Sequence, residues 1–217
     1  MALALFDLDD TLIAGDSASL WLEYMVAEEL APASMLADEQ ALMSLYHHGK
    51  MDMHQYMAFT LQPLAGKSRQ WLDQLSQHFV EQVLRERLYP EGVARIEWHR
   101  EQGDELVLIS ASSEHLVAPM ARMLRMDHCV AIMLEEKEGV LTGLTHGTLS
   151  FRAGKVDRIN QLFAGKESLW QGSFGYSDSH NDLPMLRVVT YPHVVNPAPS
   201  LRQQAEELGW PVWEWKR

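Results

Sequence analysis

Three carboxylates close the first apolar run of the chain and could carry chemistry. Residues 3–6 are apolar, and Asp7, Asp9 and Asp10 follow them. Alternate side chains of an extended backbone share one side, so Asp7 and Asp9 are expected together, with Leu8 pointing away. Two carboxylates this close repel each other unless a cation or a proton lies between them. The stretch therefore predicts a functional site rather than an ordinary strand end.

Other polar residues follow later apolar runs. Ser110 ends the run at residues 105–110, and Asp178 follows a further run, with Asp182 four residues later. Lys155 opens a predicted helix between them. Carboxylates from two strand ends can hold Mg²⁺, which takes oxygen ligands and keeps several waters. A magnesium site is therefore expected where these strands end.

These residue types together predict metal-assisted phosphoryl transfer. Ser110 and Lys155 can bind the oxygens of a phosphate that lies against the metal. Asp7 is then free to attack phosphorus and form an aspartyl-phosphate. Asp9 could protonate the departing alcohol and later deprotonate the attacking water.

The elements that must position these residues follow an alternating pattern from residue 90 onward. Strand and helix patterns alternate there, which predicts a doubly wound α/β core with a parallel sheet. In such folds ligands bind outside the carboxyl ends of the strands. A small hairpin is expected over residues 139–151. Strands are expected at residues 3–6, 105–110, 129–134, 172–176 and 193–196, where the last clear strand pattern lies.

A helical block separates the first strand from the rest of the core. Helical patterns with no strand pattern run from Gly15 to Leu88, and Asp16 is placed to cap the first helix. We therefore expect residues 1–14 and 88–217 to form the α/β core domain. Residues 15–87 are expected to form an inserted helical cap domain.

Composition narrows the partners and the compartment. The chain has 217 residues, is 47% hydrophobic and carries a net charge of −12. This charge argues against nucleic acid and anionic membrane, which need a positive footprint. The single cysteine, Cys129, suits a reducing compartment. No signal peptide and no membrane-spanning run is expected, so the prediction is a cytoplasmic protein, with monomer and homodimer both open.

Four segments resemble, in order, the four motifs of the haloacid dehalogenase (HAD) superfamily. They are residues 7–11 (Asp-Leu-Asp-Asp-Thr), Ser110, Lys155 and residues 175–182 (Gly-Tyr-Ser-Asp-Ser-His-Asn-Asp). The helical block resembles the cap of the phosphoserine-phosphatase-like branch, subfamily IB. Asp9 favours phosphate over haloalkane substrates, because the dehalogenases of this superfamily lack that second acid.

The resemblance implies a role for each matching residue. Asp7 would be the nucleophile and Asp9 the acid and base. Mg²⁺ would be held by Asp7, Asp178 and the Asp9 backbone carbonyl, with Asp182 supporting the metal ligands. Ser110 and Lys155 would bind the phosphate.

Within this branch the chain is most similar to bacterial HAD-type histidinol-phosphatases. The similarity rests on residues 110–112 (Ser-Ala-Ser), 141–143, 176–179 and 209–211. Phosphoserine phosphatases usually have Gly-Gly where Ala111 and Ser112 stand. Their cap glutamate near the substrate amine corresponds by spacing to Asp16, whereas their cap arginine for the carboxylate has no clear match beyond Arg69.

Histidinol phosphate has an amine but no carboxylate, so the resemblance favours L-histidinol phosphate among small amine-bearing metabolite phosphates. Candidate substrate contacts are Asp16, Ser112 and Asn181. Asp16 could equally serve only as a helix cap.

Other functions stay open from the sequence. Phosphoserine phosphatase, or another phosphatase of small metabolites, is the first alternative. A phosphotransferase would need an acceptor alcohol, whereas a hydrolase releases free phosphate without one. A non-catalytic phosphate-binding module would show no magnesium-stimulated hydrolysis of an aryl phosphate.

Overall fold

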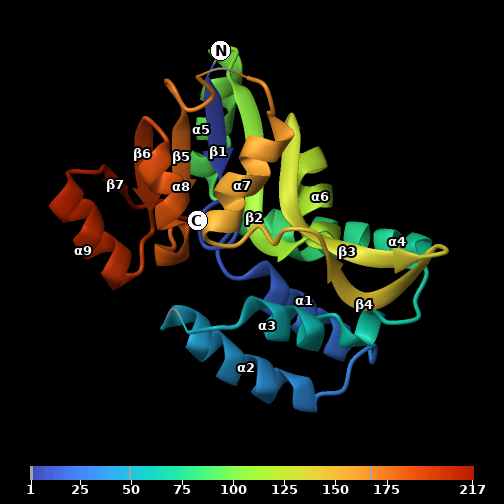
Figure 1. Cartoon of the computed structure of the whole chain (residues 1–217). Helices are drawn as coiled ribbons and strands as arrows, with labels where there is room; N and C mark the ends of the chain where they lie inside the picture. Colours follow the sequence, from blue (N-terminus) through green and yellow to red (C-terminus); the bar gives the residue numbers. More distant parts are fainter. Residues whose placement is uncertain (1, 49, 167) are drawn as a thin grey trace.

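The computed structural model describes residues 2–48, 50–166 and 168–217. Within them seven strands form one sheet in the order β4-β3-β2-β1-β5-β6-β7 (Figure 1). All neighbouring strands run parallel except β3 and β4. The doubly wound parallel sheet expected from the sequence is confirmed. The strands are β1 Leu3–Phe6, β2 Glu105–Ser113, β3 His128–Lys137, β4 Val140–His146, β5 Phe174–Ser177, β6 Tyr191–Val195 and β7 Val212–Trp213.

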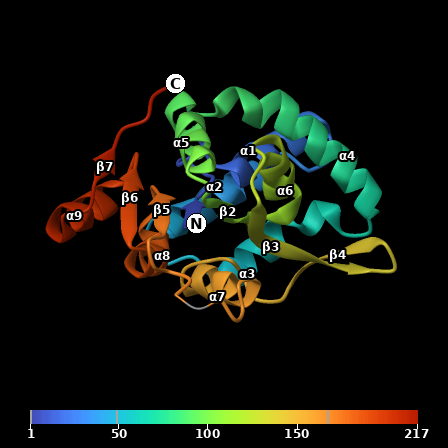
Figure 2. The ribbon, with the colours of Figure 1, turned by 90° about the horizontal axis from the view of Figure 1, so that it is seen from above.

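Helices cover both faces of the sheet because its strands are apolar on both faces. Leu3 and Leu5 pack in one hydrophobic cluster with residues of α7, α8 and α9, whereas Ala4 and Phe6 pack in the other with residues of α5 and α6. Figure 2 shows α5 and α6 on one side of the sheet and α7 and α8 on the other. These helices are α5 Pro90–Glu101, α6 Glu114–Met123, α7 Ala153–Leu162, α8 Leu183–Val188 and α9 Pro199–Leu208.

The block between β1 and α5 is helical, as expected. Helices α1, α2 and α3 lie together across the end of the sheet at which β1 leads into α1 (Figure 1). Its core is continuous with the sheet, because Trp21 and Met53 belong to the same hydrophobic cluster as Phe6. The domain boundaries at residues 14/15 and 87/88 stay a prediction. The helices are α1 Ser17–Ala27, α2 Ser34–His47, α3 Met53–Thr60 and α4 Arg69–Phe79, followed by a π-helical turn at Val80–Leu84.

Residues 139–151, expected to form a small hairpin of their own, contribute one strand, β4, and its hairpin partner is the preceding strand β3. This hairpin joins the sheet to the helical block. The Leu141 N–H donates to the Lys67 carbonyl at 2.9 Å, and the Gly66 N–H donates to the Leu141 carbonyl at 2.9 Å. Helix α4 packs beside α6, and both lie on the same side of the sheet (Figure 2). The segment between α3 and α4 is thus fixed to β4 by backbone hydrogen bonds.

One strand was not expected from the sequence. The last clear strand pattern, at residues 193–196, corresponds to β6, and a further strand, β7, pairs with it, with Val194 opposite Val212. A two-residue strand after a proline has no pattern of its own and is defined only by its partner. The strand at Glu105–Ser113 also runs past Ser110, with a register shift against β3 between Ile109 and Ser113. No helix in the described residues is long and apolar enough to cross a membrane.

Candidate active site

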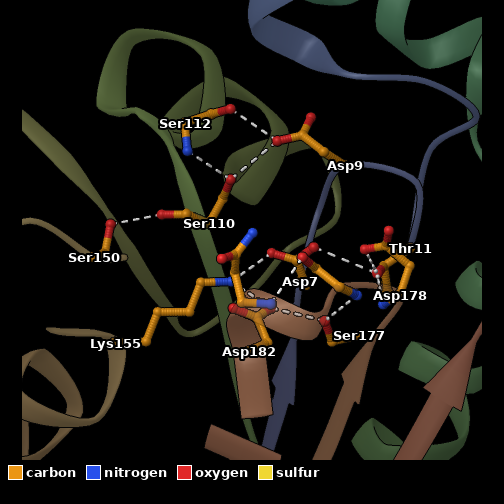
Figure 3. Close-up of polar contacts among 12 residues, drawn as sticks. Asp7, Asp9, Thr11, Ser110, Ser112, Ser150, Lys155, Ser177, Asp178 and Asp182 are labelled. Carbon is orange, nitrogen blue, oxygen red and sulfur yellow. Dashed lines mark hydrogen bonds and ion pairs between the residues drawn. The ribbon is translucent and has the colours of Figure 1, made fainter. Parts of the chain in front are cut away.

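The floor of the candidate site is built by two neighbouring strands. Because β1 pairs with β5, the residues that follow them, Asp7 and Asp178, come close together. The Thr11 hydroxyl lies 3.4 Å from Asp7 Oδ2 and 3.2 Å from Asp178 Oδ1, and it accepts the Asp178 N–H at 3.0 Å (Figure 3). One buried hydroxyl therefore links two carboxylates that lie 171 residues apart in the numbering of the sequence.

A buried lysine holds the other oxygen of Asp7. Lys155, in the first turn of α7, is 1% exposed and donates to Asp7 Oδ1 at 2.7 Å and to Asp182 Oδ2 at 2.6 Å. Ser177 also donates to Asp182, at 2.8 Å. Burial disfavours the charge on Lys155, but Asp182 and Asp7 outweigh it and raise its pKa, so the ammonium group persists. Asp182 thus contacts Lys155 directly and helps to hold it against Asp7.

Asp9 lies where the helical block leaves the core. Its Oδ1 accepts the Ser17 N–H at 2.6 Å, in the first turn of α1. Its Oδ2 accepts from the hydroxyls of Ser112 at 2.8 Å and Ser110 at 3.2 Å (Figure 3). Ser112 also lies 3.0 Å from the Ser17 hydroxyl. These contacts fix the carboxylate between the end of β2 and the start of α1.

A cavity of about 810 Å³ opens above this floor. Five of the predicted site residues line it: Asp7, Asp9, Asp16, Asp178 and Asn181. The other four lie behind this lining and reach it through hydrogen bonds to Asp7, Asp9 or Lys155: Ser110, Ser112, Lys155 and Asp182. Ser112, expected as a candidate substrate contact, holds Asp9 in the structure.

Acidic groups crowd this cavity. Burial raises the pKa of Asp7 to about 8, although Lys155 opposes the shift. Burial and the neighbouring Asp7 carboxylate raise the pKa of Asp178 well above its usual range. Burial and Asp9 raise the pKa of Asp16 to about 7. The site therefore holds more carboxylate than its own cations can balance, which favours a cationic ligand.

A family model described as haloacid dehalogenase-like hydrolase matches residues 4–187 of this chain. The chain belongs to this family. A histidinol-phosphatase from Neisseria meningitidis serogroup C (strain 8013) is 34% identical over 219 residues, which cover 99% of each chain. The predicted membership in the HAD superfamily and its phosphoserine-phosphatase-like branch is confirmed.

Solved structures share the fold of this HAD hydrolase. A protein of unknown function from Bordetella pertussis Tohama I has a TM-score of 0.88 and 36% identity, covering 98% of this chain and 97% of that one. A phospho-aspartyl intermediate analogue of phosphoserine phosphatase has a TM-score of 0.71 and 18% identity, covering 100% and 94%. At this identity the second likeness shows the fold alone. With its family and its phosphatase relatives, the chain is a phosphomonoester hydrolase, as expected.

Glu39 of α2 is a further residue of the site, and the sequence did not predict it. Glu39 lines the cavity, is 7% exposed, and accepts at Oε1 from Ser19 at 2.6 Å and from Tyr56 at 3.3 Å. The Ser19 N–H donates to Asp16 at 2.8 Å, so Ser19 links Asp16 to Glu39. A signal existed: Glu39 lies four residues after buried Met35, on the apolar face of its helix.

The donor set of this HAD hydrolase fits the expected magnesium ion. Among the described residues, no group of three or more His, Cys, Asp or Glu side chains could hold a metal. The set implied by the resemblance needs only two carboxylates and one carbonyl, because Mg²⁺ retains several waters. Asp7 and Asp178 meet at Thr11, both line the cavity, and their pKa values are raised. Oxygen donors with excess negative charge match a small divalent cation.

Proposed function

We propose that this HAD hydrolase is a Mg²⁺-dependent phosphomonoester hydrolase that acts through an aspartyl-phosphate on Asp7. One observation carries the proposal: Asp7 lines the cavity while the buried Lys155 holds one of its oxygens at 2.7 Å. The nucleophile is thus oriented before substrate arrives, which is the main contribution a protein makes to phosphoryl transfer.

The proposed steps use the residues of the floor. An Asp7 oxygen attacks phosphorus, the bond from phosphorus to the ester oxygen breaks, and Asp9 gives its proton to the leaving alcohol. Asp9 then takes a proton from water, which attacks the phosphoryl group, releases inorganic phosphate and restores Asp7. Ser110 and Lys155 bind phosphate oxygens. Mg²⁺, held by Asp7, Asp178 and the Asp9 carbonyl, would neutralise charge on the transferring group.

The proposed substrate is a small amine-bearing metabolite phosphate, with L-histidinol phosphate favoured and L-histidinol as product. The Neisseria relative is a histidinol-phosphatase. The acidic cap groups Asp16 and Glu39 suit an ammonium group. Arg69, the nearest match for a carboxylate-binding cap arginine, is not in the cavity lining and pairs with Asp73 at 2.9 Å and Glu114 at 2.8 Å.

L-Phosphoserine is the second candidate. Its carboxylate would need a cation, and Arg152 lines the cavity from the core. Phosphoryl transfer to an alcohol and phosphate binding without turnover are more remote candidates. A cytoplasmic location also stays a prediction.

Phosphate release with and without magnesium tests the reaction. Asp7→Asn should lower kcat by about 10⁴-fold or more and abolish acid-stable labelling from a radiolabelled phosphate ester. The matched control is Asp38→Asn, an exposed carboxylate of α2, which should retain full activity. Turnover that survives Asp7→Asn would overturn the proposed function.

A substrate panel tests the choice of ester. L-Histidinol phosphate, L-phosphoserine and p-nitrophenyl phosphate are compared by kcat/KM, the quantity that expresses discrimination. The highest value is expected for L-histidinol phosphate. A higher value for L-phosphoserine would select the second candidate. Phosphate appearing only with an added alcohol acceptor would indicate a transferase.

A further inference from the structure

Arg152 is a cavity-lining cation to which none of the four motifs assigns a role. It precedes α7 directly and lies three residues before Lys155. Among the described residues that line the cavity it is the one Lys or Arg side chain. Six acidic residues line the same cavity: Asp7, Asp9, Asp10, Asp16, Glu39 and Asp178. A dianionic phosphate entering this space would therefore meet mostly negative charge.

The guanidinium group is held at the floor side of the cavity. Arg152 Nε donates to Asn181 Oδ1 at 3.0 Å, and the guanidinium carbon lies 4.8 Å from the centre of the Phe151 ring. Asn181 is 7% exposed, and its N–H donates to the Ser179 hydroxyl at 3.2 Å. Since Ser179 directly follows Asp178, these contacts place the guanidinium beside the end of β5.

The backbone at Arg152 carries strain. Its φ is 52° and its ψ is −125°, in a region that favours glycine. The turn before α7 is tight, because a Cβ on Gly154 would lie 2.0 Å from the Leu149 carbonyl oxygen. A non-glycine residue in such a conformation lowers the stability of the folded state. The side chain at position 152 is thus present at a cost to the fold.

We propose that Arg152 is a further phosphate-binding residue, whose guanidinium contacts oxygens of the substrate phosphate in addition to Lys155. This inference rests on the proposed function. The Lys155 ammonium already pairs with two carboxylates, those of Asp7 and Asp182, so its positive charge is shared before a phosphate enters. A guanidinium matches the geometry of phosphate oxygens and, in a water-excluded site, stabilises the charge of the transition state.

Replacement by glycine separates function from folding. Arg152→Gly removes the guanidinium and relieves the strained φ together, so Tm should stay equal or rise. We expect kcat/KM to fall about 100-fold for every phosphate ester tested. The inhibition constant for inorganic phosphate should rise about tenfold or more, because it reports binding of the phosphate group itself.

The matched control is Arg125→Gly. Arg125 also has a φ of 52°, but it is exposed beyond the end of α6. This variant should gain similar stability while kcat/KM and phosphate inhibition stay unchanged. If Arg152→Gly does not fold, Arg152→Met provides the same comparison without the change in backbone freedom.

Three outcomes would overturn the inference. One is phosphate inhibition and kcat/KM within about twofold of wild type. Another is a loss confined to L-phosphoserine, which would make Arg152 a carboxylate ligand. The last is an Arg152→Gly/Asn181→Ala double variant no worse than Asn181→Ala alone, which would mean that Arg152 only positions Asn181. If Asp7→Asn is inactive and Arg152→Gly is fully active, only this inference fails and the proposed function stands.

Discussion

The floor and the cap wall of the cavity are built in opposite ways. On the floor, Lys155 and Asp7 lie 148 positions apart in the chain, and Thr11 and Asp178 lie 167 apart. On the cap wall, Ser19 and Glu39 are 20 positions apart and Tyr56 and Glu39 are 17 apart. The floor is therefore assembled by the order of strands in the sheet, and the wall by one helical insertion.

This difference assigns the two halves separate tasks. The floor needs the whole sheet, so altering it should affect both folding and every substrate. The wall belongs to a single local block, so altering it should change which substrate is accepted and leave the chemistry intact. The following variants test this division, from the largest expected effect to the smallest.

Removing the buried cation of the floor should have the largest effect. Lys155→Met leaves Asp7 and Asp182 buried without their partner, which should lower the free energy of unfolding by about 3–5 kcal/mol. Loss of the proposed phosphate ligand should also lower kcat by about 10³-fold for all esters. Denaturant unfolding and phosphate release measure the two effects.

The control for this variant is Lys166→Met, which removes an ion pair to Glu105 whose lysine is 37% exposed. A surface pair contributes about 1 kcal/mol or less, so stability and activity should change little. Equal effects of the two substitutions would break the contrast between the buried floor and the rest of the protein.

Changing the cap wall should act on one class of substrate. Glu39→Gln keeps the shape of the side chain but removes its charge, so kcat/KM for L-histidinol phosphate should fall about 10- to 100-fold. The value for p-nitrophenyl phosphate, which has no amine, should stay the same. Asp38→Asn, the exposed neighbour, is the control. Equal losses for both esters would show that Glu39 supports the cap structure rather than the amine.

The junction of the two halves should show the smallest effect at neutral pH. His115, in α6, packs edge to face against Trp21 of α1 with ring centres 5.1 Å apart. Neither of its ring nitrogens has a hydrogen-bond partner among the described residues. Burial lowers its pKa from 6.5 to about 3. The folded protein therefore holds this ring neutral.

The sign of the pH effect follows from that shift. Between pH 6.5 and about 3 the unfolded chain takes up a proton that the folded protein refuses, so the stabilisation is complete above pH 6.5 and is lost as the pH falls. From pH 7 to pH 5 the loss is about 2 kcal/mol. The His115→Leu variant should lose about 2 kcal/mol less stability than the wild type between pH 7 and pH 5. Denaturant unfolding of both proteins at the two pH values measures this difference. The pKa of His193 is also lowered by burial, to about 4, but that histidine is present in both proteins. An identical pH dependence of the two proteins would contradict the prediction.

The sequence by itself determined the parts that depend on neighbours in the chain. The apolar runs that end at Asp7 and near Asp178 form strands, and the residues within a few positions of each run are enough to predict this. Alternating patterns then determine a doubly wound sheet, and parallel strands must bring their carboxyl ends to one edge. The partners of the floor could therefore be named from residue types alone.

Only the tertiary structure decided the parts whose meaning depends on packing. Glu39 is one polar residue of a helix until α2 folds over Asp16, and Arg152 is a turn residue until Asn181 lies beside it. Residues 212–213 form strand β7 because they pair with the edge of the sheet at β6. Ser112 follows the same rule, since its hydroxyl meets Asp9 only when β2 and the start of α1 come together. Contacts of this kind join segments whose separation is set by the whole fold, and no local pattern encodes that distance.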